Sequence, residues 1–132
     1  ARPAGYRPLL FPRPGHADLP AAIKYDLTDV RDMVRGYRLA AELGCAGQAY
    51  NLGSGIPRSI RSVLAWFVTA ADVDIEVVTD PARQRPVDVP RTLCDASKAR
   101  SDLGWAPSIP FERTLADILD YWRARVGAEK GT

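Results

Sequence analysis

Helix-like and strand-like stretches alternate along this chain, and this alternation limits the folds that the chain can adopt. The expected helices run from Thr28 or Asp29 to about Leu43, from Ser59 onward, from Asp95 to about Leu103, and over Glu112–Val126. The expected strands, one before the first helix and three between helices, are Ala21–Tyr25, Gln48–Leu52, Val73–Val78 and Thr92–Cys94. Such an alternation predicts a small α/β fold of three to four helices with short strands.

Apolar residues at helical spacing predict the inward faces of these helices. Gly44 and Gly104 follow two of the helices and fit a helix end. The expected inward residues are Val30, Met33, Val34, Tyr37, Ala40 and Ala41 in the first helix, Ile60, Val63, Leu64 and Phe67 in the second, and Leu115, Ile118, Leu119 and Trp122 in the last.

Composition narrows the class of protein. A chain of 132 residues is large enough for one domain, and its net charge of +2 gives no reason to expect a nucleic-acid partner. No apolar run is long enough to span a membrane, and no leader pattern is present, so we expect a cytoplasmic protein. Cys45 and Cys94 are expected to be reduced thiols, and a single histidine, His16, excludes a multi-histidine metal site.

Prolines divide the chain into a lead-in and a body. Residues 1–24 contain five prolines, which interrupt every periodic pattern, so this segment is either a poorly ordered tail or a strap across the body. Residues 25–126 form the expected α/β domain. Residues 127–132 are expected to be a frayed tail.

One loop, Asp80–Pro90, carries the residues with the clearest binding chemistry. Arg83 and Arg85 offer planar sets of donors that match phosphate oxygens, and Asp88 can accept hydrogen bonds from a pair of sugar hydroxyls. Three prolines stiffen the loop and reduce the entropy lost when it orders. The alternative interpretation is an exposed polar connection whose arginines contact only water.

Six short motifs occur in an order that resembles a known family. They are Asp26-Leu-Thr-Asp-Val-Arg-Asp32, Tyr50-Asn-Leu-Gly-Ser-Gly55, Ser59-Ile-Arg61, Asp80-Pro-Ala-Arg-Gln-Arg-Pro-Val-Asp88, Asp95-Ala-Ser-Lys98 and Leu103-Gly-Trp105. Together they resemble the C-terminal lobe of extended short-chain dehydrogenases that act on nucleotide sugars, in the group of GDP-mannose 4,6-dehydratases and GDP-4-keto-6-deoxymannose reductases. The resemblance implies the fold of the family's substrate-binding part, without its Rossmann half.

The resemblance also implies roles for individual residues. Arg85 would hold phosphate oxygens of a GDP-linked sugar, and Asp88 the ribose hydroxyls; Arg83 would lie in the same loop, and Arg61 would be a further phosphate or sugar contact. The alternative for Arg61 is a solvent-facing helix residue. Tyr25 stands where the family usually has arginine, which removes one expected substrate contact.

The family's NAD(P)-binding apparatus is missing from this sequence. It contains neither G-x-G-x-x-G nor Tyr-x-x-x-Lys, the motifs that bind the dinucleotide and supply the proton donor in this family. We therefore expect no cofactor, no catalytic residue and no hydride transfer for this chain alone.

A second, shorter resemblance lies in residues 13–32. Arg13-Pro-Gly-His-Ala-Asp-Leu19, Lys24-Tyr25 and Asp29-Val-Arg-Asp32 are similar to a stretch of chorismate synthase, in which the motif histidine takes part in flavin-assisted phosphate elimination. About twenty residues carry this similarity. His16 is expected to be an exposed loop residue here.

Four functions remain open from the sequence. The chain is a nucleotide-sugar-binding lobe without catalysis, a stand-alone nucleotide-diphosphate-binding module, a structural or oligomerising protein without a ligand, or one half of a pair with a separate cofactor-binding subunit. In the family, the helix like Thr28–Leu43 packs on the cofactor domain. We therefore expect its uncovered stripe to drive homo-oligomer formation, or residues 1–24 to cover it.

Overall fold

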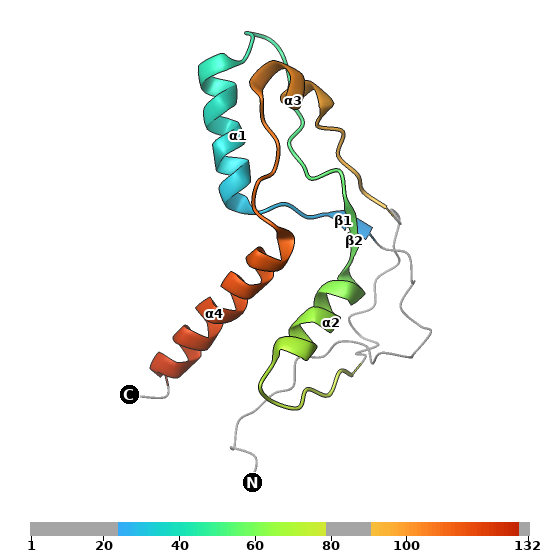
Figure 1. Cartoon of the computed structure of the whole chain (residues 1–132), viewed down its shortest axis with the longest axis vertical. Coiled ribbons are helices and arrows are strands. Elements are labelled where there is room, and N and C mark those ends of the chain that lie inside the picture. The colour runs from blue at the N-terminus through green and yellow to red at the C-terminus, as the bar shows by residue number, and fades with distance from the viewer. Residues whose placement is uncertain (1–23, 79–90, 130–132) are drawn as a thin grey trace.

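The computed structural model describes residues 24–78 and 91–129, which contain four helices and a short two-stranded sheet that lies at one side of the molecule (Figure 1). The order of elements is β1 (Lys24–Asp26), α1 (Val30–Leu43), β2 (Pro57–Ser59), α2 (Ile60–Ala70), α3 (Ser97–Leu103) and α4 (Phe111–Glu129). Helix α1 packs beside α3 at one end of the molecule, and α2 contacts α4 at the other. The expected α/β class with four helices is confirmed.

Local capping sets where the helices begin and end. The Asp29 side chain accepts a hydrogen bond from the Arg31 backbone N–H at the start of α1. The Ser59 hydroxyl accepts one from Ser62 at the start of α2. Gly104 ends α3 with a φ of 63°, a conformation that glycine adopts without strain. These three boundaries agree with the sequence prediction.

The two strands form an antiparallel pair. Lys24 pairs with Ser59, Tyr25 with Arg58, and Asp26 with Pro57. Because side chains alternate along a strand, Tyr25 and Arg58 project from one face of this sheet, and Lys24 and Ser59 from the other.

Three of the strand predictions are wrong. Residues 48–52, 73–78 and 92–94 form no strand, although Val77 in the second of these segments is buried. Of the first expected strand, Ala21–Ile23 lie outside the described residues, and Lys24 and Tyr25 belong to β1; β2 was not predicted. A strand needs a hydrogen-bonded neighbour, and alternation of apolar and polar residues does not supply one.

A small core lies between α1 and α3. Trp105, Ala99 and Leu103 are almost fully buried, together with Ala96. The half-buried side chains packed around them are Leu39, Ala40, Tyr50, Leu52 and Cys94. Trp105 is fully buried, and its indole Nε1 donates a hydrogen bond to the Asp32 carbonyl oxygen at 2.9 Å.

Helix α1 buries an unexpected face. Its buried residues are Asp32 and Gly36, whereas Val30, Val34 and Tyr37 are 60–70% exposed. A Cβ at Gly36 would lie 2.6 Å from Leu52 Cδ1 and 2.9 Å from Trp105 Nε1, so only glycine allows this close approach. Of the predicted inward stripe of α1, Val30, Val34 and Tyr37 therefore face away from the core, whereas Ala40 packs against it.

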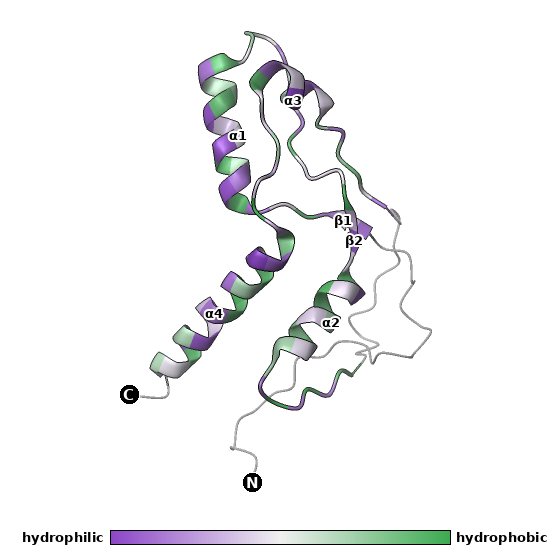
Figure 2. Cartoon of the chain, viewed as in Figure 1, coloured by the Kyte–Doolittle hydropathy of each residue, from purple (hydrophilic) through white to green (hydrophobic). Residues whose placement is uncertain are grey.

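The other two apolar stripes are also only partly buried. In α4, Leu115 is buried, but Ile118 and Trp122 are 42% and 53% exposed. No residue of α2 is fully buried. Figure 2 shows hydrophobic and hydrophilic residues interleaved along both α1 and α4. None of the helices in residues 24–78 and 91–129 has the length and apolarity that a bilayer crossing requires.

Candidate functional site

The loop predicted to bind phosphate and ribose begins and ends at anchored positions. Arg83, Arg85 and Asp88 themselves lie outside the described residues. Val77, shortly before the loop, is 3% exposed. After the loop, Arg91 forms a parallel bridge with Lys24, and the Thr92 N–H donates to the Lys24 carbonyl at 2.9 Å. The loop therefore returns to the body at the edge of β1.

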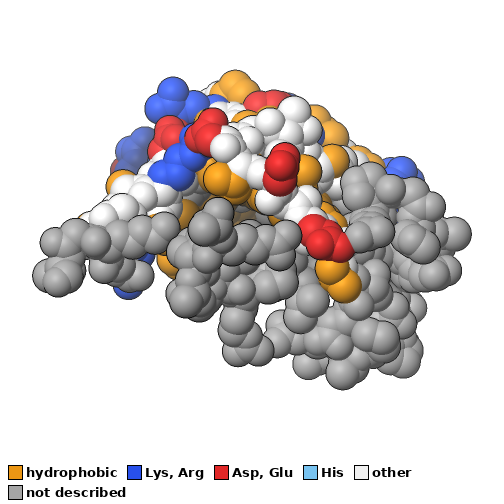
Figure 3. Space-filling model, turned by 90° about the horizontal axis from the view of Figure 1, so that it is seen from below, with side chains coloured by type: hydrophobic (Ala, Val, Ile, Leu, Met, Phe, Trp, Pro, Cys, Tyr) orange, Lys and Arg blue, Asp and Glu red, His pale blue; other side chains and the backbone are white. Residues whose placement is uncertain are grey.

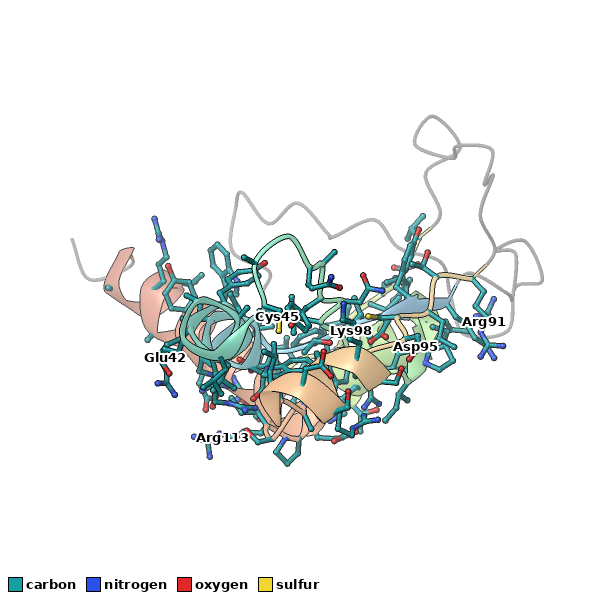
Figure 4. The ribbon with its side chains drawn as sticks, turned by 90° about the horizontal axis from the view of Figure 1, so that it is seen from above. Glu42, Cys45, Arg91, Asp95, Lys98 and Arg113 are labelled. Atoms are coloured by element: carbon teal, nitrogen blue, oxygen red, sulfur yellow. The ribbon has the colours of Figure 1, made fainter. Side chains whose placement is uncertain are left out.

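A backbone bridge joins two basic residues, Lys24 and Arg91, and a third, Arg61, lies two residues past the strand partner of Lys24; we call these three residues the basic corner. The backbone of Lys24 pairs with that of Ser59 on one side and with that of Arg91 on the other. Arg61 follows Ser59 by two residues, in the first turn of α2. Figure 4 shows Arg91 close to strand β1. Of the four predicted site residues, Arg61 is thus the one whose position the structure describes.

Sequence reasoning missed Lys24 and Arg91 as candidate ligands. They are 67 positions apart, and only the bridge between their backbones brings them together. Their positive charges raise the local potential and would favour a bound diphosphate. The signal that could have found Arg91 is its place directly after the predicted binding loop.

The Asp26 carboxylate holds the turn of the Tyr50–Gly55 motif against β1. It accepts hydrogen bonds from the Ser54 N–H at 2.8 Å, the Gly55 N–H at 2.8 Å and the Cys94 N–H at 3.0 Å, and from the Ser54 hydroxyl. Burial raises the pKa of Asp26, but these hydrogen bonds outweigh burial and hold it below its ordinary value. Asp26 therefore joins three segments, β1, the turn at Ser54–Gly55 and the stretch at Cys94.

A close approach explains the glycine in this turn. A Cβ at Gly53 would lie 2.4 Å from Cys94 Cβ and 2.8 Å from its Sγ. Cys94 and Cys45 are both free, as expected. Burial, together with the Asp26 and Asp95 carboxylates, raises the pKa of the Cys94 thiol, so this thiol is a poor nucleophile.

The described residues do not fit a bound NAD(P). Dinucleotides of this kind bind where parallel strands lead into helices through a glycine-rich turn. The sheet that the structure describes has two antiparallel strands. In the same part of the chain, no three His, Cys, Asp or Glu side chains lie close enough to hold a metal ion.

The order and spacing of these elements match a known family. The sequence profile described as GDP-mannose 4,6 dehydratase matches residues 21–118, which include β1, the Asp26 turn and both ends of the predicted binding loop. The chain belongs to the GDP-mannose 4,6 dehydratase family. The resemblance inferred from the six motifs is therefore confirmed.

Individual members of the family agree with this assignment. The chain is 33% identical to GDP-6-deoxy-D-mannose reductase of Pseudomonas aeruginosa over 107 residues, which cover 81% of this chain and 35% of that protein. The structure of RMD from Pseudomonas aeruginosa complexed with NADPH superimposes with a TM-score of 0.72 at 29% identity, over 79% of this chain and 33% of that one. The chain thus spans about a third of the length of these relatives.

The chain also matches a chorismate synthase, over a longer segment than the twenty or so residues of the motif at 13–32. The chorismate synthase of Acidothermus cellulolyticus is 37% identical over 93 residues, which cover 70% of this chain and 23% of that protein. A segment of 93 residues must include much of the family domain, so the similarity extends beyond the lead-in. His16 lies outside the described residues.

Proposed function

We propose that this chain binds a GDP-linked sugar and forms the nucleotide-sugar-binding lobe of a reductase- or dehydratase-like protein, without the catalytic and cofactor half. The observation that carries this proposal is the similarity over 81% of the chain to a protein named GDP-6-deoxy-D-mannose reductase. In the proposal, Arg83 and Arg85 hold the diphosphate, Asp88 holds the ribose hydroxyls, and Arg61 contacts the phosphate or the sugar.

The basic corner supports this arrangement. Lys24 and Arg91 are bridged just after the loop that contains Arg83, Arg85 and Asp88, and Arg61 lies two residues past the strand partner of Lys24. A diphosphate held by the loop would lie within range of their charges, and charged donors bind phosphate oxygens more strongly than neutral ones do. Two alternatives remain: a module that binds any nucleotide diphosphate, and a structural lobe with no ligand.

A thermal-shift titration tests the proposal. GDP or GDP-mannose at about ten times the dissociation constant should stabilise the chain by about 1.4 kcal/mol, a shift of several degrees, whereas UDP, dTDP and NADPH should give none. Arg85→Ala should weaken GDP binding by about 1.5–3 kcal/mol, because it removes a charged hydrogen bond.

Asp88→Ala separates the two parts of the proposed site. It should weaken GDP binding and leave pyrophosphate binding unchanged, because pyrophosphate has no ribose. Arg38→Ala is the matched control for Arg85→Ala, since Arg38 is exposed on α1 and pairs with Glu42. A shift with every nucleotide diphosphate would favour the general module. Without a shift from any nucleotide, in a chain that melts cooperatively, the structural alternative would hold.

We also propose that the chain forms homo-oligomers through the apolar face of α1 and α4. Val30, Ile118, Tyr121 and Trp122 line a groove of about 440 Å³ at this face. Figure 3 shows hydrophobic side chains among the charged ones on the side seen from below. The Arg31–Asp117 ion pair, at 2.8 Å, joins the two helices beside the groove. Exposed apolar surface of this kind favours association.

Sedimentation velocity over a range of concentrations tests this association. The wild-type chain should form dimers or larger species as its concentration rises, and Tyr121→Glu, which places a charge in the groove, should remain monomeric. Asp120→Lys, an exposed change at the neighbouring position, should leave association intact. A wild-type monomer at every concentration would contradict the proposal.

A further inference from the structure

Residues 91–94, which follow the proposed nucleotide-binding loop, are attached to β1 at two points. At the first, the Thr92 N–H donates to the Lys24 carbonyl oxygen at 2.9 Å. At the second, the Cys94 N–H donates to Asp26 Oδ2 at 3.0 Å. The donors lie two residues apart, and so do the acceptors, which is the spacing of a parallel ladder. The Asp26 carboxylate thus takes the place that a backbone carbonyl would have if β1 were longer.

The same carboxylate also holds the turn before β2. Asp26 Oδ2 accepts from the Gly55 N–H at 2.8 Å, and Asp26 Oδ1 accepts from the Ser54 N–H at 2.8 Å and from the Ser54 hydroxyl. A Cβ at Gly53 would lie 3.1 Å from Asp26 Oδ2 and closer still to Cys94. The turn, the carboxylate and the stretch after the loop are therefore packed against one another.

The place of Arg91 depends on this attachment. Arg91 is bridged to Lys24 and directly precedes the first attachment point. Without the Asp26 carboxylate, residues 91–94 would lose one of their two hydrogen bonds to β1, and they would have to become ordered when a ligand binds. Ordering of this kind lowers affinity, whereas a segment that is ordered in advance preserves it.

We propose that Asp26 is a positioning residue for the diphosphate of the bound nucleotide, a role that rests on the proposed function. Its carboxylate fixes residues 91–94 and so keeps Arg91 beside Lys24, where both positive charges favour the diphosphate. Asp26 does not contact the anion itself, because its negative charge repels phosphate and its two oxygens already accept four hydrogen bonds. A carboxylate suits this task because an ionised acceptor binds N–H donors more strongly than a neutral one does.

Calorimetric titration of the 132-residue chain with GDP, at constant ionic strength, tests this role. Asp26→Ala removes the four hydrogen bonds and should weaken GDP binding about ten-fold, because residues 91–94 must then become ordered on binding. Asp26→Asn keeps one acceptor oxygen and should cause a smaller loss of affinity. Circular dichroism at the titration temperature checks folding, and Asp26→Asn replaces the alanine variant if that variant does not fold.

Asp32 provides the matched control. Its carboxylate also accepts from two backbone N–H groups and a serine hydroxyl, but at the contact between α1 and the segment that leads into α4. Asp32→Asn should destabilise the chain at least as much as Asp26→Asn, because it also loses the charge that pairs with Arg35. It should nevertheless leave the GDP affinity of the folded chain within about two-fold of wild type, as expected for distant sites. A merely structural role of Asp26 would make affinity follow stability in both variants.

A double-mutant cycle shows whether Asp26 acts through Arg91. Arg91→Gln alone should weaken GDP binding. Adding Asp26→Ala, or Asp26→Asn, should then cause a much smaller further loss than the same change causes alone, because the side chain that Asp26 positions is gone. Amide hydrogen exchange without ligand gives an independent readout, in which the Thr92 and Cys94 amides should exchange faster in the Asp26 variants than in Asp32→Asn.

Two results would overturn the role of Asp26 and leave the proposed function standing. One is a wild-type chain that binds GDP with the same affinity as its folded Asp26 variants. The other is a set of fully additive losses in the cycle with Arg91→Gln. A wild-type chain that does not bind GDP would instead overturn the proposed function, and the role of Asp26 with it.

Discussion

Replacing Trp105 by alanine is expected to destabilise the fold by about 3–5 kcal/mol, the usual cost of removing a large buried aromatic side chain. Trp105 has no exposed surface, packs in the core cluster with Ala99 and Leu103, and donates to the Asp32 carbonyl. Its loss would leave a cavity between α1 and α3 and remove the indole hydrogen bond to α1. Because small domains are stable by only about 5–15 kcal/mol, urea denaturation followed by circular dichroism should show a large decrease in the midpoint.

Two variants separate packing from hydrogen bonding at this position. Trp105→Phe keeps most of the apolar volume and removes the indole N–H, so it should cost markedly less than alanine. Trp122→Ala removes the same side chain from a position that is 53% exposed, and should cost about 1 kcal/mol or less. Equal effects of Trp105→Ala and Trp122→Ala would contradict the central place of Trp105 in the core.

Asp32→Ala is expected to destabilise the fold by about 3–5 kcal/mol, because it removes the carboxylate partner of the half-buried Arg35 guanidinium and leaves two backbone donors without their acceptor. The Asp32 carboxylate is 1% exposed and accepts from Arg35 at 2.7 Å, from the Ser108 N–H and the Ile109 N–H at 2.9 Å each, and from the Ser108 hydroxyl at 2.8 Å. Burial raises the pKa of Asp32, but these donors outweigh burial and hold it below its ordinary value. Urea denaturation measures the loss.

A surface aspartate provides the control for this variant. Asp120 is 74% exposed and lies 3.6 Å from Arg123, so Asp120→Ala should change the free energy of unfolding by about 0.5 kcal/mol or less. Asp32→Asn should be intermediate in effect, because the amide keeps one acceptor oxygen but loses the charge. A destabilisation by Asp32→Ala no larger than that of Asp120→Ala would show that the loop from Trp105 to Ile109 does not depend on this carboxylate.

Helix prediction succeeded and strand prediction mostly failed, for a physical reason. A helix closes its hydrogen bonds within four residues, so the caps at Asp29 and Ser59 and the stop at Gly104 can be recognised in the sequence. A strand needs a partner that can come from anywhere in the chain. The partner of Lys24–Asp26 is Pro57–Ser59, and the pattern of apolar residues did not predict this pairing. The same pattern predicted strands at 48–52 and 73–78, where the structure has none.

The residues of the candidate site were also predicted only in part from the sequence. The sequence indicated the arginines and the aspartate of the loop between Asp80 and Pro90, because their chemistry matches phosphate and ribose. It did not indicate Lys24 and Arg91, whose association depends on a backbone bridge.

The sequence by itself determined the family, the class of fold, the starts of α1 and α2 and the end of α3, because each of these depends on short motifs and their order. The tertiary structure alone decided which face of α1 is buried. Apolar spacing predicted the face with Val30, Val34 and Tyr37, but the buried face carries Asp32 and Gly36. The reason is that the partners of Asp32 lie 76 and 77 residues away, at Ser108 and Ile109, and their hydrogen bonds orient the helix.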